Sequence, residues 1–306
     1  MLGYVARRVA GFLPVLFVIV SVSFFIMRLA PGGPFDQDRA LPEQVRANIE
    51  ARYHLDEPLW QQYLRYLGDV TRGDLGPSFR YPDRTVNELL GLGFPVSLLL
   101  GACAMAVAVC LGGAAGLLAG THRNGPLDYL TMSFALFGVS IPNFVLGPIA
   151  MLVFALALGW FPVAGWGSWR HVILPAFTLG TFYAAYVARL TRAGMLEVIG
   201  QDFIRTARAK GLREATVVVR HALPSAILPV VSYLGPASAA VLTGSVVVES
   251  VFSIPGIGRY FVASALNRDY TMVLGTVVAY SVLLLVFNLC VDILYAYLDP
   301  RVQVQG

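Results

Sequence analysis

Charged residues are scarce in this sequence, and lysine is almost absent. Only 13% of the 306 residues are charged, whereas 57% are hydrophobic. Soluble domains carry about 25% charged residues, so this composition excludes an ordinary soluble domain. Lys210 is the single lysine, and the net charge is +4. The sequence therefore predicts a polytopic membrane protein.

Motifs for catalysis and metal binding are also missing. A phosphate-binding loop of the GxxxxGK[ST] type needs a lysine followed by serine or threonine, but Lys210 is followed by Gly211. The sequence contains no HExxH or GxSxG motif. The three cysteines lie inside apolar runs, where they suit packing, and the four histidines are scattered. We therefore expect no catalytic residue, no metal site and no cofactor bound by this chain.

Long apolar runs dominate the rest of the sequence. A bilayer core of roughly 30 Å requires about 20 apolar residues per helix. Six runs reach this length: 9–27, 95–119, 127–158, 172–190, 227–248 and 272–295. The third contains Pro142 and Pro148, so we expect it to kink or break. The first lacks a small-residue cleavage site and is expected to be a retained helix.

The basic residues predict the orientation of these spans. They gather before the first span and between the fourth and fifth, where the loop 191–222 is rich in arginine. Short cytoplasmic loops carry the excess of arginine and lysine. We therefore expect both termini and the loop 191–222 to be cytoplasmic.

The fold predicted is an all-α integral membrane protein in three parts. Residues 1–29 form the first span, 30–94 an external helical segment, and 95–306 a core of five spans. Within the external segment, the apolar spacing predicts helices over 41–53 and 58–70. Pro58 suits the first turn of the second helix.

The basic block 203–213 is the most informative stretch, because it is polar and lies between two apolar runs. A short helix followed by Gly211 suggests a left-handed turn after the helix. Such a helix–glycine–helix element can serve as a handle for another protein, whose acids would pair with Arg205, Arg208 and Lys210. An ordinary basic loop on the cytoplasmic face is the alternative.

The stretch 203–224 resembles the EAA loop of permeases in binding-protein-dependent ABC importers. Ala207, Gly211, Leu223 and Pro224 match that pattern, whereas Arg205, Thr206 and His221 depart from it. The peptide-importer branch commonly reads much as residues 204–212 do. Further stretches look like the B-type permease of bacterial oligopeptide importers, and the similarity runs essentially end to end: 25–34, 73–78, 254–258, 265–270 and 298–300.

This resemblance implies a permease of the dipeptide, oligopeptide and nickel family in the bacterial inner membrane. It implies a C-type permease partner, two ATPase subunits that hold ATP and Mg, and an external peptide-binding protein. It favours oligopeptides, with dipeptides, nickel chelates or glutathione as alternatives. The implied ATPase-coupling residues are Arg205, Ala207, Arg208, Lys210, Gly211, Leu212, Leu223 and Pro224.

Two spans hold polar residues that are candidates for a transport pathway. Small and hydroxyl residues in the fifth span suit either tight helix packing or a pore wall. Asn288 and Asp292 share one face of the sixth span, where an acid indicates either function or a structural contact at the inner interface, for instance with Arg189 or the partner subunit. The candidates are Ser238, Thr243, Ser245, Asn288 and Asp292.

The stretch after the fifth span contains a proline and two glycines that predict a turn on the outer side. This turn either re-enters the membrane or is a plain loop. The resemblance favours a periplasmic gate or a docking surface for the binding protein. The candidates are Glu249, Pro255, Gly256, Gly258, Asn267, Arg268 and Asp269.

Two other classes of protein fit the composition less well. An ion-coupled secondary transporter would show paired intramembrane charges and an inverted repeat. An intramembrane enzyme would show a nucleophile with its base, or a metal constellation. The sequence shows neither set of features clearly.

Overall fold

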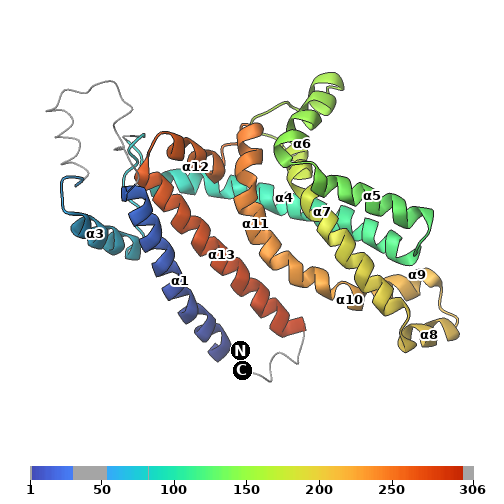
Figure 1. The fold of residues 1–306 in the computed structure, drawn as a ribbon. Coiled ribbons are helices and arrows are strands. Elements are labelled where there is room, and N and C mark those ends of the chain that lie inside the picture. The colour runs from blue at the N-terminus through green and yellow to red at the C-terminus, as the bar shows by residue number, and fades with distance from the viewer. Residues whose placement is uncertain (1, 30–53, 82, 299–306) are drawn as a thin grey trace. The chain divides into compact units, whose positions relative to one another are not determined.

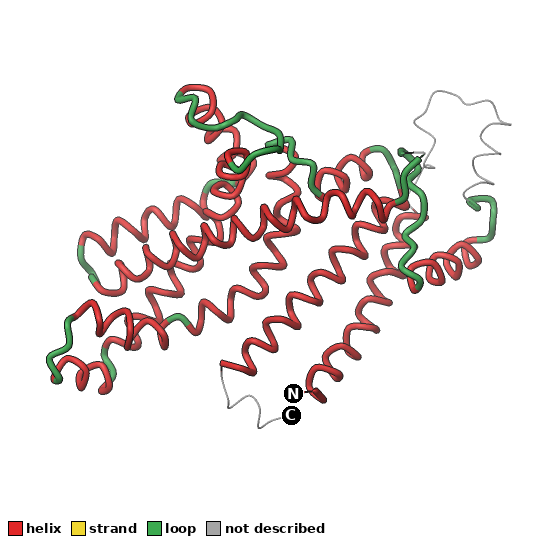
Figure 2. Tube along the Cα trace, turned by 180° about the vertical axis from the view of Figure 1, so that it is seen from behind, coloured by secondary structure: helices red, strands yellow, loops and turns green. Residues whose placement is uncertain are grey.

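The computed structural model describes residues 2–29, 54–81 and 83–298. Within these ranges the chain is largely helical (Figures 1 and 2). The single β-bridge in these ranges joins Pro77 and Thr85. The expected helix over 41–53 and the stretch 30–34 lie outside the described residues. The helices are α1 (Leu2–Leu29), α3 (Leu59–Thr71), α4 (Val86–Thr121), α5 (Pro126–Ser140), α6 (Asn143–Ala150), α7 (Arg170–Ile199), α8 (Asp202–Ala209), α9 (Glu214–Thr216), α10 (Leu223–Ala226), α11 (Leu228–Val251), α12 (Ile257–Leu266) and α13 (Tyr270–Leu298).

Four described helices, α1, α4, α7 and α13, are long and apolar enough to cross a membrane. Two bent pairs bring the number to six if each pair is one span. The expected break in the third run is confirmed, since the helical segments Pro126–Ser140 and Asn143–Ala157 are bent by 106° relative to each other. Pro142 explains the break, because the residue before a proline is driven out of the helical region. Ile141 is accordingly extended, with φ −95° and ψ 116°.

The chain packs as two compact units. One contains Met1–Val96 and Pro255–Val286, and the other contains Ser97–Ile254 and Phe287–Gly306. The long helices α4 and α13 each contribute residues to both units.

In the first unit, α3 packs on α1 through aromatic rings. The ring of Phe24 lies 5.4 Å from those of Tyr63 and Tyr66, and the Ser21 and Tyr63 hydroxyls are 2.6 Å apart. The helix expected over 58–70 is confirmed, with Pro58 at its N-cap; its external location stays a prediction. Burial raises the pKa of the Tyr66 phenol, whose oxygen finds no hydrogen-bond partner among the described residues.

The same unit joins two stretches that are far apart in the sequence at Asp269. This carboxylate is fully buried and caps α13 by accepting a hydrogen bond from the Met272 amide at 3.2 Å. It also accepts from the Ser78 hydroxyl at 2.5 Å and from the amides of Phe79 and Arg80 at 3.2 Å. The family-like stretches 73–78 and 265–270 therefore form one hydrogen-bonded structure.

In the second unit, α4 and α7 approach closely along a row of glycines. A Cβ at Gly112 or Gly116 would overlap a backbone carbonyl of α7, and one at Gly120 would lie 2.5 Å from the Met195 Cβ. A Cβ at Gly113 would meet nothing within 4 Å. The glycine row therefore serves close packing of α4 on α7, because small residues allow membrane helices to approach.

A buried ion pair fixes α5 to α7. Asp128 accepts hydrogen bonds from Nε and Nη2 of Arg192 at 2.6 and 2.7 Å, and from the Asn124 amide at 2.9 Å. Its side chain is 3% exposed. Three donors therefore satisfy a carboxylate that would otherwise be costly to bury.

Candidate functional site

The short helix α8 lies at the end of α7 (Figure 1). Its two faces differ in burial. Its buried face consists of Ile204 and Ala207, which pack on Met195 and Val198 of α7 and on Val217. Its other face is exposed and includes Phe203, Arg205 and Arg208. The helix is therefore anchored on one side and presents a basic and partly apolar surface on the other.

The turn after α8 depends on Gly211. This residue has φ +74°, which confirms the expected left-handed conformation. The Gly211 amide donates to the Arg208 carbonyl oxygen at 2.9 Å, and the Lys210 amide to that of Thr206 at 3.1 Å. A Cβ at Gly211 would meet nothing within 4 Å, so the requirement for glycine comes from the backbone alone.

The basic residues of this loop are placed differently from one another. Arg208 forms two hydrogen bonds with Glu214 within the chain, at 3.1 and 2.6 Å. These bonds raise the pKa of Arg208. Arg205 lies 3.5 Å from the exposed Asp202. Lys210 is exposed, and no carboxylate of the described residues lies within 4 Å of it. Leu212 is 40% exposed, on the same loop.

The end of the loop returns the chain to the membrane helices. Residues Val217–Ala222 form a π-helical turn, and α10 follows with Leu223 and Pro224 at its start. Leu223 packs against the cluster that also buries Ile204. A Cβ at Gly194 of α7 would overlap the Ala226 carbonyl oxygen of α10. The loop is therefore packed tightly on α7 at both of its ends.

The pathway candidates fall into different environments. Ser238 is half-buried and donates to the Leu234 carbonyl oxygen at 2.6 Å. Ser245 is fully buried. Asn288 is half-buried, and the side chains of Thr243 and Asp292 lie outside the described ones. Their assignment to a pathway stays a prediction.

Ser245 belongs to a buried polar cluster around Glu249. The Glu249 Oε1 atom accepts hydrogen bonds from the hydroxyls of Ser97 and Ser245, each at 2.7 Å. All three residues are at most 1% exposed. Glu249 thus ties α11 to α4 from inside the unit and is not on the surface.

The remaining outer candidates surround α12. Gly256 is the N-cap of this helix and Gly258 is buried within it, while Pro255 precedes them. Asn267 is exposed and ends the helix, and Arg268 has φ +55°. Asp269 is buried in the hydrogen-bonded structure described above. A role of these residues in gating or docking stays a prediction.

Sequence reasoning missed an aromatic and cationic surface shared by α7 and α11. The Tyr186 ring stacks on that of Tyr233 at 5.6 Å, and the Arg189 guanidinium lies 4.6 Å from the Tyr186 centroid. Phe182 adjoins Tyr186 at 5.3 Å. The spacing 182, 186 and 189 is one helical face, but the sequence alone does not show that Tyr233 meets it.

Metal binding finds no support in the described part of the chain. No three histidine, cysteine, aspartate or glutamate side chains there are grouped so that they could hold a metal ion.

Comparison with known proteins decides the family. Residues 112–304 match the family described as "Binding-protein-dependent transport system inner membrane component". The chain belongs to this family. It is 50% identical over 305 residues to the "Oligopeptide transport system permease protein OppB" of Haemophilus influenzae, covering 99% of this chain and 100% of that protein. It is 45% identical to the "Dipeptide transport system permease protein DppB" of Bacillus subtilis, covering 99% and 98% of the two chains.

The fold resembles that of solved ABC transporters. A chain of the MetNI methionine ABC transporter in an inward-facing conformation matches with a TM-score of 0.59 and 18% identity, over 69% of this chain and 96% of that one. An amino acid ABC transporter matches with a TM-score of 0.53 and 20% identity, over 69% and 94%. The family member is thus an all-α membrane permease with the fold of ABC importer subunits.

Proposed function

We propose that the chain is the permease subunit of an ATP-driven importer that passes oligopeptides from an external binding protein to the cytoplasm. The observation that carries this proposal is the 50% identity, over the whole length of both chains, to a protein named as an oligopeptide permease. The geometry of α8 supports it, because a basic helix anchored on the membrane helices suits coupling to a separate motor.

The energy comes from other chains in this proposal. The partners are a C-type permease, two ATPase subunits that bind ATP and Mg, and an external peptide-binding protein. This chain has no phosphate-binding loop around Lys210 and performs no covalent chemistry. Its contribution is to couple movement of the ATPase subunits to a change in the side of the membrane to which the pathway is open.

Force is transmitted through the packing of α8. Its buried residues Ile204 and Ala207 share one apolar cluster with α7 and with the π-helical turn that leads to α10 and α11. Well-packed side chains resist deformation, so a displacement of α8 moves the ends of α7 and α11 with it. These two helices carry the Tyr186, Arg189 and Tyr233 surface.

That surface is our candidate for the inner part of the pathway. Arginine and tyrosine side chains can donate hydrogen bonds to the carbonyl oxygens of a peptide. An ionisable residue in a membrane span usually faces a water-filled cavity or the inside of a bundle. Arg189 is exposed in this chain, as expected for a residue that faces the pathway.

The proposed orientation follows from the charge distribution. Both termini and α8 lie on the cytoplasmic side of the inner membrane, and α12 lies outside. Labelling a single cysteine at Gln62 in spheroplasts should succeed, and labelling at Glu214 should not.

Reconstitution in vesicles tests the proposal. Uptake of a labelled pentapeptide should require ATP, the binding protein and both permeases, and the purified chain alone should not hydrolyse ATP. An excess of unlabelled dipeptide should compete poorly, whereas strong competition would favour the dipeptide permease alternative suggested by the 45% identity to DppB. Uptake driven by an ion gradient without ATP would refute the importer assignment.

A further inference from the structure

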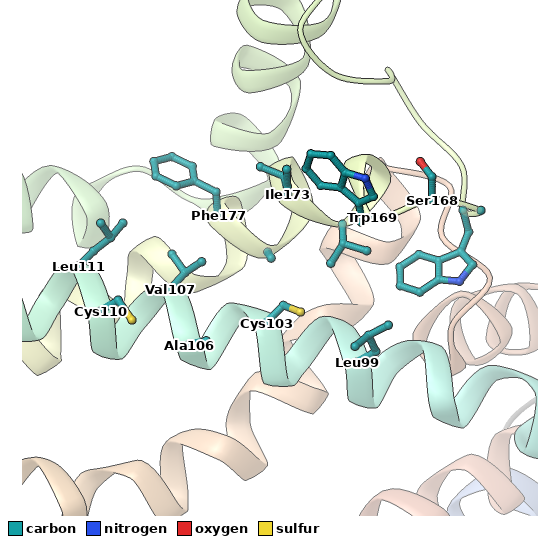
Figure 3. Close-up of a pocket in the computed structure, with 14 residues that line it drawn as sticks. Leu99, Cys103, Ala106, Val107, Cys110, Leu111, Ser168, Trp169, Ile173 and Phe177 are labelled. Atoms are coloured by element: carbon teal, nitrogen blue, oxygen red, sulfur yellow. The ribbon is translucent and has the colours of Figure 1, made fainter.

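An apolar groove opens between α4, the start of α7 and the loop before it. Its volume is about 800 Å³. In Figure 3 the Val107 side chain of α4 points toward Phe177 of α7, and Leu99 lies farther along α4, toward the Ser168 end of the groove. No described residue that lines it carries a formal charge. The lining residues include Leu99, Ala106, Leu111, Trp166, Trp169 and Phe177.

The cross-section of the groove suits a hydrocarbon chain better than a helix. The groove follows α4 from Leu99 to Leu111, which is roughly 18 Å at about 1.5 Å per residue. A volume of about 800 Å³ over this length leaves a cross-section of roughly 45 Å². A helix with its side chains is about 10 Å wide and needs nearly twice that area.

One end of the groove has the chemistry of a lipid headgroup site. Trp169 is 71% exposed and Trp166 also lines this end. Tryptophan indoles are enriched where the bilayer meets water. Arg170 follows Trp169 and is exposed, and the Ser168 hydroxyl lies 2.9 Å from Nδ1 of His171. An exposed arginine that directly follows an indole lining this apolar groove complements an anionic phospholipid.

We propose that this groove binds one acyl chain of an anionic phospholipid, with the phosphate directed toward Arg170. The headgroup end is the end of α7 opposite to α8, so the lipid belongs to the outer leaflet in the proposed orientation. The bound chain fills the space between α4 and α7 beyond the glycine row and stabilises their packing there.

A photoreactive phosphatidylglycerol with a diazirine in its acyl chain tests the site in the assembled transporter. Ala106 is exposed and lines the groove, so Ala106→Trp fills it without entering the core. Ala102, one turn earlier, is exposed but does not line the groove, and Ala102→Trp is the matched control. We expect cross-links within 99–111 and 166–177, reduced at least fivefold by Ala106→Trp and less than twofold by Ala102→Trp.

A second variant tests the headgroup independently of any change in packing. Arg170→Gln should lower the yield with phosphatidylglycerol about threefold or more, and should leave the yield with the same probe in phosphatidylcholine unchanged. Equal yields in wild type and Ala106→Trp would overturn the proposal. The absence of lipid cross-links at 99–111 would also overturn the proposal, since it would show that a neighbouring permease covers this face.

Discussion

Arg208 and Glu214 face each other across the turn at Gly211 and are joined by two hydrogen bonds. The Nη2–Oε1 distance is 2.6 Å and the Nε–Oε2 distance is 3.1 Å. The sequence interpretation assigned Arg208 to an acid on an ATPase subunit, whereas here its partner lies in its own loop. Both side chains are largely exposed, so the pair contributes little to global stability. Its effect is to hold the two sides of the turn together.

A charge swap separates this role from direct docking. Arg208→Glu places two carboxylates together, and we expect peptide-stimulated ATP hydrolysis to fall two- to fivefold. The double variant Arg208→Glu with Glu214→Arg restores the pair and should recover most of the activity. If the double variant is as impaired as the single one, Arg208 instead contacts another subunit. Lys210→Glu is the comparison variant. It breaks no described ion pair, so any loss of ATP hydrolysis in it would come from contact with another subunit.

The conformation of Gly211 gives a second prediction. A side chain in the left-handed region costs about 1–2 kcal/mol, and a β-branched one costs more. Gly211→Val should therefore distort the turn and reduce the amount of ATPase subunit retained on the purified permease. Gly200 has φ −82° and open space around it, so Gly200→Val is the control and should retain wild-type amounts. Similar losses in both variants would show that the left-handed turn is not the cause.

The glycine row between α4 and α7 gives a third prediction. Gly116→Leu would force the helices apart, and we expect destabilisation of about 1–3 kcal/mol. The neighbouring Gly113 faces open space, so Gly113→Leu should be tolerated. Thermal unfolding of the two variants in detergent makes the comparison. A lower midpoint for Gly113→Leu than for Gly116→Leu would contradict the helix packing described.

The buried cluster at Glu249 gives a fourth prediction. Ser97→Ala removes one of the two described hydroxyl donors to Glu249, and leaving a buried hydrogen-bond acceptor less satisfied costs about 1–3 kcal/mol. Among the described residues the Ser232 hydroxyl bonds only to its own helix, at the Leu228 carbonyl oxygen, so Ser232→Ala is the control and should change stability little. In both variants, the reactivity of Cys103 of α4 toward a thiol reagent is followed as guanidinium is added, and earlier exposure of Cys103 reports loss of the contacts of α4. Equal accessibility in the two variants would count against a tie between α4 and α11.

The features that the sequence predicts correctly are local ones. The break before Pro142, the helix after Pro58 and the left-handed Gly211 depend on a few adjacent residues whose backbone preferences are strong. The apolar runs likewise indicate helices long enough to span a membrane, because span length depends only on bilayer thickness.

The features that the sequence does not reveal are contacts between distant residues. Arg192 and Asp128 are 64 residues apart, and Ser97 and Glu249 are 152 apart. Helical periodicity places each residue on a face but does not pair one face with another. For the same reason Glu249 could be read as an outer-surface residue, although it is fully buried. The ion pair of Arg208 was missed because Glu214 lies beyond the glycine turn.

In the proposed function, the exposed face of α8 contacts the ATPase. A photo-cross-linking amino acid at Phe203, which is 44% exposed on that face, tests it in the assembled transporter. The control position is Trp169, at the opposite end of α7. We predict an adduct with an ATPase subunit from position 203 and none from position 169. If no ATPase adduct formed at position 203 in an actively transporting complex, the exposed face of α8 would not be the ATPase contact.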